Sequence, residues 1–223
     1  MTTWPLRVDT VVLDVDGTLV DSNYHHTLAW WRALRDEGYD VPAWRIHRAV
    51  GMGGDRLVAA VAGEDVERSA GDRVREAWEK HYDAVLDEIQ PLPGATDLLR
   101  ALRDRGFRVA LASSGIPRHT RHAVEVLDAD DAATTTTTSE DADESKPDPE
   151  LLQVALEHAE AARAVLVGDS VWDVESGIEA GIPVIGLLSG GFGRDELQAA
   201  GAVLVCEDVE ELTRRLEELL ARA

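Results

Sequence analysis

Cysteine and lysine are scarce in this sequence. Cys206 is the one cysteine, and Lys80 and Lys146 are the only lysines, among 223 residues. A single cysteine excludes an internal disulfide and favours a reducing, cytoplasmic location. Because nearly all the positive charge is arginine, a lysine that stands beside a motif is informative about that motif.

Long apolar runs and positive net charge are also missing. No run approaches the roughly 18 apolar residues of a membrane-spanning helix. The first residues, MTTWPLRVDT, have no basic stretch leading into an apolar one, so we expect no secretory signal. With 43 acidic side chains against 22 lysines and arginines, the net charge is −21. This charge argues against nucleic-acid and anionic-membrane partners. A GC-rich genome and a salty cytoplasm would both produce such an acid excess.

Apolar residues, 44% of the chain, are arranged as an α/β pattern. Short β-branched runs predict buried strands of a parallel sheet covered on both faces. These runs are 10–15, 108–112, 164–167, 183–187 and 202–205. Helical patterns alternate with them, at about 94–105, 117–127, 149–159, 171–180 and 208–221. The alternation predicts a doubly wound, Rossmann-like parallel sheet. Threonines 134–138 predict one further strand, at an edge.

One long segment interrupts the alternation. Residues 22–88 hold helical patterns and no convincing strand. Leu28, Trp31, Leu34 and Arg35 predict the face of a first helix that ends at Gly38, and helices at about 54–62 and 72–88 follow. We therefore expect two domains. They are an α/β core of residues 1–21 and 89–223, and an inserted helical cap of residues 22–88.

Two carboxylates follow the first strand. Asp14 and Asp16 are two residues apart, and Gly17 allows the chain to turn directly after them. Ligands of parallel sheets sit at the carboxyl ends of the strands. Two carboxylates there suit a hard cation or divided nucleophile and acid/base roles. Turn acids with a helix cap are the plainer alternative.

Polar groups follow two other strands as well. Ser113, Ser114 and Gly115 form a strand-to-helix turn, which is suited to an anion, and an ordinary capped turn is the alternative. Asp169 and Asp173 follow the strand ending at residue 167, where they would serve equally as helix caps. Lys146 stands before Pro147 in a stiff segment, where it would neutralise a phosphate or a carboxylate. A surface lysine is the alternative.

Taken together in this order, these motifs resemble the haloacid dehalogenase superfamily of phosphohydrolases. The set is DxDGT from Asp14, a strand-end serine, Lys146-Pro147 and GDxxxD from Gly168. The segment 22–88 lies where that superfamily carries its helical C1 cap. The chain is most similar to the phosphoglycolate phosphatase and β-phosphoglucomutase branch, with Asp21, Ser22 and His26 opening the cap.

The resemblance implies a role for each residue. Asp14 would be the nucleophile that forms an aspartyl phosphate, and Asp16 the general acid and base. Mg²⁺ would be held by Asp14, the Asp16 carbonyl and Asp169, with help from Asp173. The residues implied to bind the phosphate or substrate are Ser113, Ser114, Gly115, Lys146 and His26.

We therefore expect a Mg²⁺-dependent phosphatase of small phosphorylated metabolites, as a monomer or homodimer. A sugar-phosphate mutase is the alternative, although Gly53 and Gly54 stand where the mutase cap loop carries an arginine. A dehalogenase is disfavoured because that branch lacks a second acid at the Asp16 position. A phosphonatase is disfavoured because its cap supplies a lysine that forms a Schiff base. The only lysine of the cap here, Lys80, lies far in sequence from the cap loop at residues 51–56. A non-catalytic phosphate-binding module would not need both Asp14 and Asp16.

Overall fold

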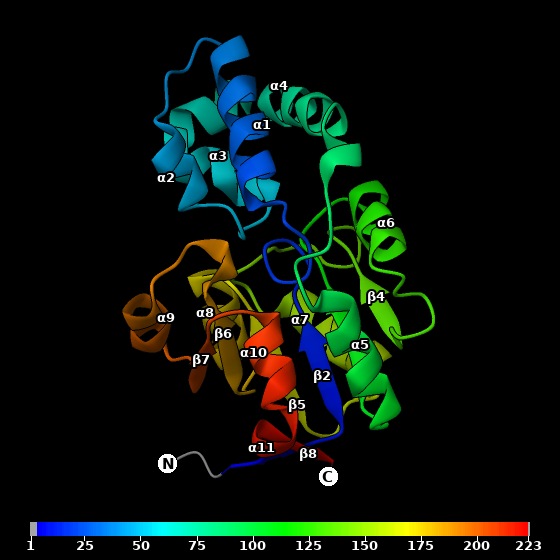
Figure 1. The fold of residues 1–223 in the computed structure, drawn as a ribbon. Coiled ribbons are helices and arrows are strands. Elements are labelled where there is room, and N and C mark those ends of the chain that lie inside the picture. Colours follow the sequence, from blue (N-terminus) through cyan, green and yellow to red (C-terminus); the bar gives the residue numbers. More distant parts are fainter. Residues whose placement is uncertain (1–3, 223) are drawn as a thin grey trace. The chain divides into compact units, whose positions relative to one another are not determined.

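The computed structural model describes residues 4–222, which fall into two compact units (Figure 1). The first unit runs up to Asp21 and resumes at Gln90, and the second is Ser22–Ile89. Among residues 4–222, no helix is both long enough and apolar enough to span a bilayer.

The first unit is built on a parallel sheet whose strands lie in the order β4-β3-β2-β5-β6-β7. The strands are β2 (Thr10–Leu13), β3 (Arg108–Ala112), β4 (Thr135–Thr137), β5 (Ala164–Gly168), β6 (Val184–Leu187) and β7 (Leu204–Cys206). The predicted α/β class is confirmed, and so is the edge strand in the threonine run. Since β2 is central and fully buried, its neighbours β3 and β5 bring distant segments of the chain to its two sides.

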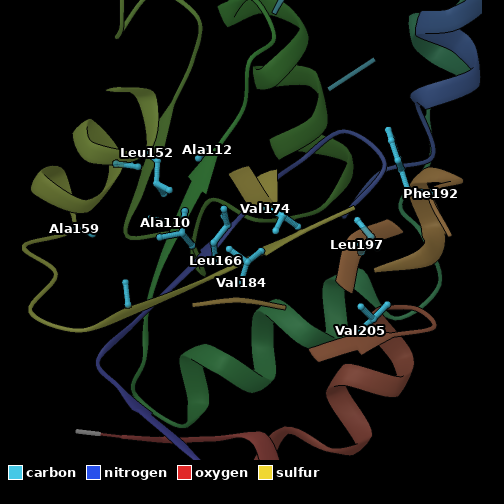
Figure 2. Packing of buried hydrophobic residues seen from close by; sticks show 13 residues of the cluster. Ala110, Ala112, Leu152, Ala159, Leu166, Val174, Val184, Phe192, Leu197 and Val205 are labelled. Carbon is cyan, nitrogen blue, oxygen red and sulfur yellow. The ribbon is translucent and has the colours of Figure 1, made fainter. Parts of the chain in front are cut away.

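The unit also contains helices. They are α5 (Ala95–Asp104), α6 (Pro117–Val126), α7 (Glu150–His158), α8 (Val171–Glu179), α9 (Arg194–Ala200), α10 (Val209–Arg214) and α11 (Leu216–Leu219), with a 3₁₀ turn at Leu188–Gly190. Helices α5, α7, α8, α9 and α10 pack on this sheet. Figure 2 shows one core cluster, in which Leu152 of α7, Val174 of α8 and Leu197 of α9 pack with Ala110 and Leu166 of the sheet. Elsewhere in this unit α5 packs against β3 and α10 (Figure 1).

The end of the chain differs from the prediction. One helix over 208–221 was expected, but the structure has α10, a break at Arg215, α11 and then β8 (Leu220–Arg222). Strand β8 pairs in parallel with β1 (Leu6–Val8). Because this pairing fixes the last residues as extended backbone, the apolar run cannot remain helical to its end.

The second unit is helical, as expected. It contains α1 (Asn23–Asp36), α2 (Ala43–His47), α3 (Gly54–Ala62), α4 (Glu64–Asp83) and a 3₁₀ turn at Leu86–Glu88. Helix α4 begins and ends earlier than the predicted 72–88. The predicted face of α1 was wrong, because Leu28 is 45% exposed. Trp31 lies under the Arg35 guanidinium, 4.7 Å from it. The buried face, which includes Trp30 and Leu34, belongs to the side that packs on α4.

The two chain segments that lead out of and back into the first unit run side by side. The Asp21 N–H donates to the Gln90 carbonyl at 2.9 Å, and the Leu92 N–H donates to the Leu19 carbonyl at 2.8 Å. These bonds hold the segment that follows the first acidic motif. They make the insertion point a defined part of the α/β unit.

Candidate active site

The candidate site lies where the sheet changes its direction of winding. Leu13, the last residue of β2, pairs with Leu111 of β3 on one side and Val167 of β5 on the other. The chain builds outward to β4 from one side and to β6 and β7 from the other. A crevice at the carboxyl ends of the strands is expected at such a point. The predicted motifs at Asp14, Ser113 and Asp169 follow these three adjacent strands.

Asp14 and Lys146 form a buried ion pair. Lys146 Nζ donates to Asp14 Oδ1, across 132 positions of sequence. The same ammonium lies 2.7 Å from Asp173 Oδ1. The Asp14 N–H donates to the Val167 carbonyl at 2.9 Å, so the start of this motif is tied to β5. The alternative of Lys146 as a surface lysine is wrong, because it is 4% exposed.

Burial and charge shift the pKa values of this pair. Burial raises the pKa of Asp14 well above its ordinary value, and Asp173 and Asp169 add to the rise, while Lys146 opposes it. Burial alone would lower the pKa of Lys146, but Asp14 and Asp173 outweigh that effect and raise it. Lys146 therefore stays an ammonium at any physiological pH. Lys146 contacts Asp14 and Asp173, and Asp169 lies near Asp14, so three acidic groups share one cation.

The acidic residues can hold a metal ion. Asp14, Asp169 and Asp173 each offer an oxygen within 4.8 Å of the others, and all three are buried. Asp169 is fixed from a second side, since Thr18 Oγ1 donates to its Oδ1 at 2.8 Å. Hard oxygen ligands suit Mg²⁺, whose charge would offset the excess of carboxylates. The donor set therefore fits the predicted cation.

Asp173 serves as a helix cap and also lies at the site. Its Oδ2 accepts the Ser170 N–H at 3.1 Å and the Ser170 hydroxyl at 2.5 Å, while Ser170 Oγ accepts the Asp173 N–H at 3.3 Å. This is a capping box at the start of α8. Since its other oxygen meets Lys146, Asp173 is held by contacts to both its oxygens.

The predicted phosphate-binding turn follows β3. Ser113 is 1% exposed, and its Oγ lies 3.5 Å from Asp16 Oδ2. The Gly115 N–H donates to Ser113 Oγ at 3.0 Å, so this donor is engaged within the turn itself. Ser114 Oγ is buried and has no hydrogen-bond partner among residues 4–222. The structure thus brings Asp16 and Ser113 together, while phosphate binding by Ser114 and Gly115 stays a prediction.

His26 belongs to the helical unit. Its ring stacks on Tyr82 with centroids 3.9 Å apart and on Trp78 at 5.7 Å. These stacking contacts make His26 part of the aromatic packing of the helical unit, and its role toward a substrate stays a prediction.

Sequence reasoning did not assign Thr18, Thr120 or Gly190. Thr18 stands inside the DxDGT motif, which was its only signal. Thr120 reaches Ser113 from α6, and Gly190 packs against Asp169. Neither carries a signal in the sequence, because each acts through a tertiary contact.

The family follows from a comparison with known proteins. Residues 8–181 match the model of the haloacid dehalogenase-like hydrolases. The chain belongs to this family. It is 30% identical over 213 residues to a phosphoglycolate phosphatase of Rhodospirillum rubrum, which covers 91% of this chain and 88% of that protein. This haloacid dehalogenase-like hydrolase is therefore an enzyme of the phosphatase type.

Solved structures agree with this assignment. A hydrolase from Pseudomonas syringae superposes with a TM-score of 0.90 at 32% identity, covering 95% of this chain and 99% of that one. A β-phosphoglucomutase from Clostridium difficile superposes with a TM-score of 0.80 at 18% identity, covering 92% and 93% of the two chains. The second likeness shows the fold alone.

Proposed function

We propose that this hydrolase is a Mg²⁺-dependent phosphatase that cleaves small organic phosphate monoesters through an aspartyl-phosphate intermediate. The observation that carries the proposal is the buried Lys146 ammonium, which contacts both Asp14 and Asp173 at the carboxyl edge of the sheet. A phosphate-binding enzyme with a net charge of −21 must supply its cations locally, and Lys146 is such a cation.

The reaction has two steps at Asp14. A carboxylate oxygen of Asp14 attacks phosphorus, and the bond from phosphorus to the leaving oxygen breaks while Asp16 gives that oxygen a proton. Asp16 then takes a proton from water, whose oxygen attacks the same phosphorus. The bond between phosphorus and the Asp14 oxygen breaks, phosphate leaves, and the Asp14 carboxylate and the Asp16 proton are restored.

The surrounding residues hold charge and position. Lys146 keeps Asp14 oriented and offsets its charge as the phosphate approaches. Mg²⁺ would be held by Asp14, Asp169 and the Asp16 carbonyl, with Asp173 close by, and it would shield the carboxylates from the dianionic phosphate. Such positioning and charge stabilisation are the main contributions of a protein to phosphoryl transfer.

The first test is phosphate release from para-nitrophenyl phosphate and from phosphoglycolate, with Mg²⁺ and with excess chelator. We expect Asp14→Asn to lower turnover by on the order of 10³-fold or more, because an amide cannot act as the nucleophile. Asp104→Asn, on the exposed side of α5, is the matched control and should leave turnover unchanged. Near-normal activity in folded Asp14→Asn protein, or full activity in chelator, would contradict the proposal.

A sugar-phosphate mutase remains the second candidate, because the enzyme shares the fold of a β-phosphoglucomutase. A mutase needs a cationic group for the second phosphate of its bisphosphate. Gly53 caps α3 and Gly54 is the first residue of that helix, and neither brings a positive charge, although Arg48 and Arg56 flank them. The glycines favour hydrolysis.

The second test incubates the enzyme with β-glucose 1-phosphate and a trace of the bisphosphate, and follows glucose 6-phosphate and free phosphate. We expect phosphate release to exceed isomerisation. Isomerisation faster than release by tenfold or more would select the mutase.

A further inference from the structure

We propose that Thr120 is a positioning residue that aims the Ser113 hydroxyl proton at the phosphoryl group of the substrate. This inference rests on the proposed phosphatase function. Thr120 lies in the first turns of α6, seven positions after Ser113. It is 3% exposed, so its hydroxyl cannot rely on water for hydrogen bonds.

Two donors occupy the acceptor side of Ser113 Oγ. Thr120 Oγ1 donates to it at 3.1 Å, and the Gly115 N–H donates to it at 3.0 Å. A hydroxyl accepts about two hydrogen bonds and donates one. With both acceptor positions filled, Ser113 keeps only its own proton for any further bond.

That proton points toward the proposed chemistry. Asp16 Oδ2 lies 3.5 Å from Ser113 Oγ, which is long for a hydrogen bond between oxygens. A bond of this length is weak, so a phosphoryl oxygen is able to replace Asp16 as the acceptor. By donating to Ser113 Oγ, Thr120 makes the Ser113 hydroxyl a hydrogen-bond donor in both states: to Asp16 without substrate, and to a phosphoryl oxygen when substrate is bound.

The Thr120 proton has one competing acceptor. The Gly115 carbonyl lies 3.5 Å from Thr120 Oγ1, which is 0.4 Å farther than Ser113 Oγ. The shorter contact is the stronger one, so the Thr120 proton is directed to Ser113. If the Thr120 hydroxyl donated to the Gly115 carbonyl, the Ser113 hydroxyl could donate to Thr120 Oγ1. Its proton would then no longer point toward Asp16 or a phosphoryl oxygen.

The space around Gly115 shows how closely these oxygens converge. A Cβ placed on Gly115 would lie 3.0 Å from Ser113 Oγ, 3.3 Å from Thr120 Oγ1 and 3.7 Å from Asp16 Oδ2. The three oxygens therefore surround one small residue on the predicted phosphate-binding turn. The arrangement is fixed by a β-strand end and a helix, which are both rigid elements.

The test compares Thr120→Val, which removes the hydroxyl at nearly constant volume, with Thr120→Ser, which retains it. We expect Thr120→Val to raise KM for para-nitrophenyl phosphate about threefold to tenfold, the size of one lost hydrogen bond, with a smaller change in kcat. The affinity for inorganic phosphate, measured by calorimetry, should fall by the same factor. Thr120→Ser should stay within about twofold of the wild type.

Two controls separate positioning from stability. Thr10→Val removes another buried hydroxyl at the amino end of β2, which donates to Asp9, and should leave KM unchanged. In the Ser113→Ala background, Thr120→Val should have no further effect on KM, because its target is gone.

The outcomes distinguish this inference from the proposed function. Wild-type protein that releases no phosphate from monoesters contradicts the phosphatase. If the wild type is active and Thr120→Val has the same KM and the same phosphate affinity as the wild type, the positioning role is contradicted. It is also contradicted if Thr120→Val raises KM as much in the Ser113→Ala background as in the wild type. Should Thr120→Val fail to fold, a Thr120→Ser KM well above the twofold limit contradicts it too.

Discussion

Gly190 shows how a residue without a side chain shapes the acidic site. A Cβ on Gly190 would lie 2.7 Å from Asp169 Cγ and equally near the Asp169 carbonyl oxygen, and closer still to Oδ2. Thr18 holds the other oxygen of the same carboxylate. The 3₁₀ turn that carries Gly190 therefore packs directly against the Asp169 carboxylate and limits where it can lie.

We expect Gly190→Ala to displace Asp169 and weaken Mg²⁺ binding by roughly 10–100-fold, the usual cost of disturbing the groups that orient a metal ligand. The Mg²⁺ concentration for half-maximal activity measures this effect, and the Mg²⁺-dependent rise in Tm measures it without catalysis. Gly193→Ala is the matched control, because its Cβ would meet only the flexible Glu196 side chain, at 3.2 Å. Unchanged Mg²⁺ dependence in Gly190→Ala would contradict this account.

Cys206 illustrates a buried group outside the site. Burial raises the pKa of its thiol to about 11, and Glu211 adds to the rise. We expect iodoacetamide at pH 8 to leave the native protein unlabelled and to label it fully in denaturant, since the thiolate is the reactive form. The pKa of the thiol is about 11 in the folded protein and 9.0 when it is exposed by unfolding. The free energy of unfolding is therefore unaffected by this group below about pH 9 and falls as the pH rises from 9 toward 11. Rapid labelling of native protein would contradict the burial.

At the scale of elements, one segment places Lys146. A single oxygen of Glu150, Oε2, accepts the Asp143 N–H at 2.8 Å and the Glu144 N–H at 2.9 Å. Glu150 is the first residue of α7, so these bonds tie the segment before Lys146 to the helix after it. On the other side of Lys146, Ser176 of α8 donates to the Asp148 carbonyl at 3.3 Å.

We expect Glu150→Ala to loosen this segment and lower kcat/KM about threefold to tenfold, the effect of one or two exposed hydrogen bonds. Glu150→Gln, which keeps an acceptor oxygen, should restore most of the activity. Glu157→Ala, exposed farther along α7, should have no effect and serves as the control. Equal activity in Glu150→Ala and wild type would show that the segment is held without Glu150.

The same scale explains what the sequence could predict. Strands such as β2 and β5 are continuous apolar runs with a turn signal after them, so both their type and their place were predictable. Strands β1 and β8 were missed because each has its partner at the other end of the chain. The face of α1 was predicted wrongly because tryptophans occur on both sides of that helix, and only packing on α4 selects Trp30 over Trp31.

In the candidate site, too, some features could be predicted from the sequence and others could not. Asp14, Lys146 and Asp173 were predicted from motifs and meet in the structure. The double use of Asp173, as cap and as ion-pair partner, could not be resolved from spacing, because both uses need the same residue at the same position.

At the scale of the whole molecule, the main feature is the charge of −21, from 43 acidic and 22 basic side chains. About half of the acids therefore have no cation to pair with, and their mutual repulsion opposes the compact state. Exposed pairs such as Arg73 with Glu37, at 2.7 Å, contribute little each and lose that contribution in salt. Screening of the repulsion should outweigh this loss.

We therefore expect Tm to rise by a few degrees between low salt and 1 M NaCl, where the screening length falls to about 3 Å. For a chain of this size, about 1 kcal/mol of relieved repulsion corresponds to roughly 2–4 °C. KCl should act equally, because screening depends on ionic strength. A rise that levels off near 1 M is expected of an acid-rich composition alone, while a Tm that climbs steeply beyond 1 M would indicate adaptation to high salt. An unchanged or falling Tm would show that the ion pairs outweigh the repulsion, contrary to the argument from net charge.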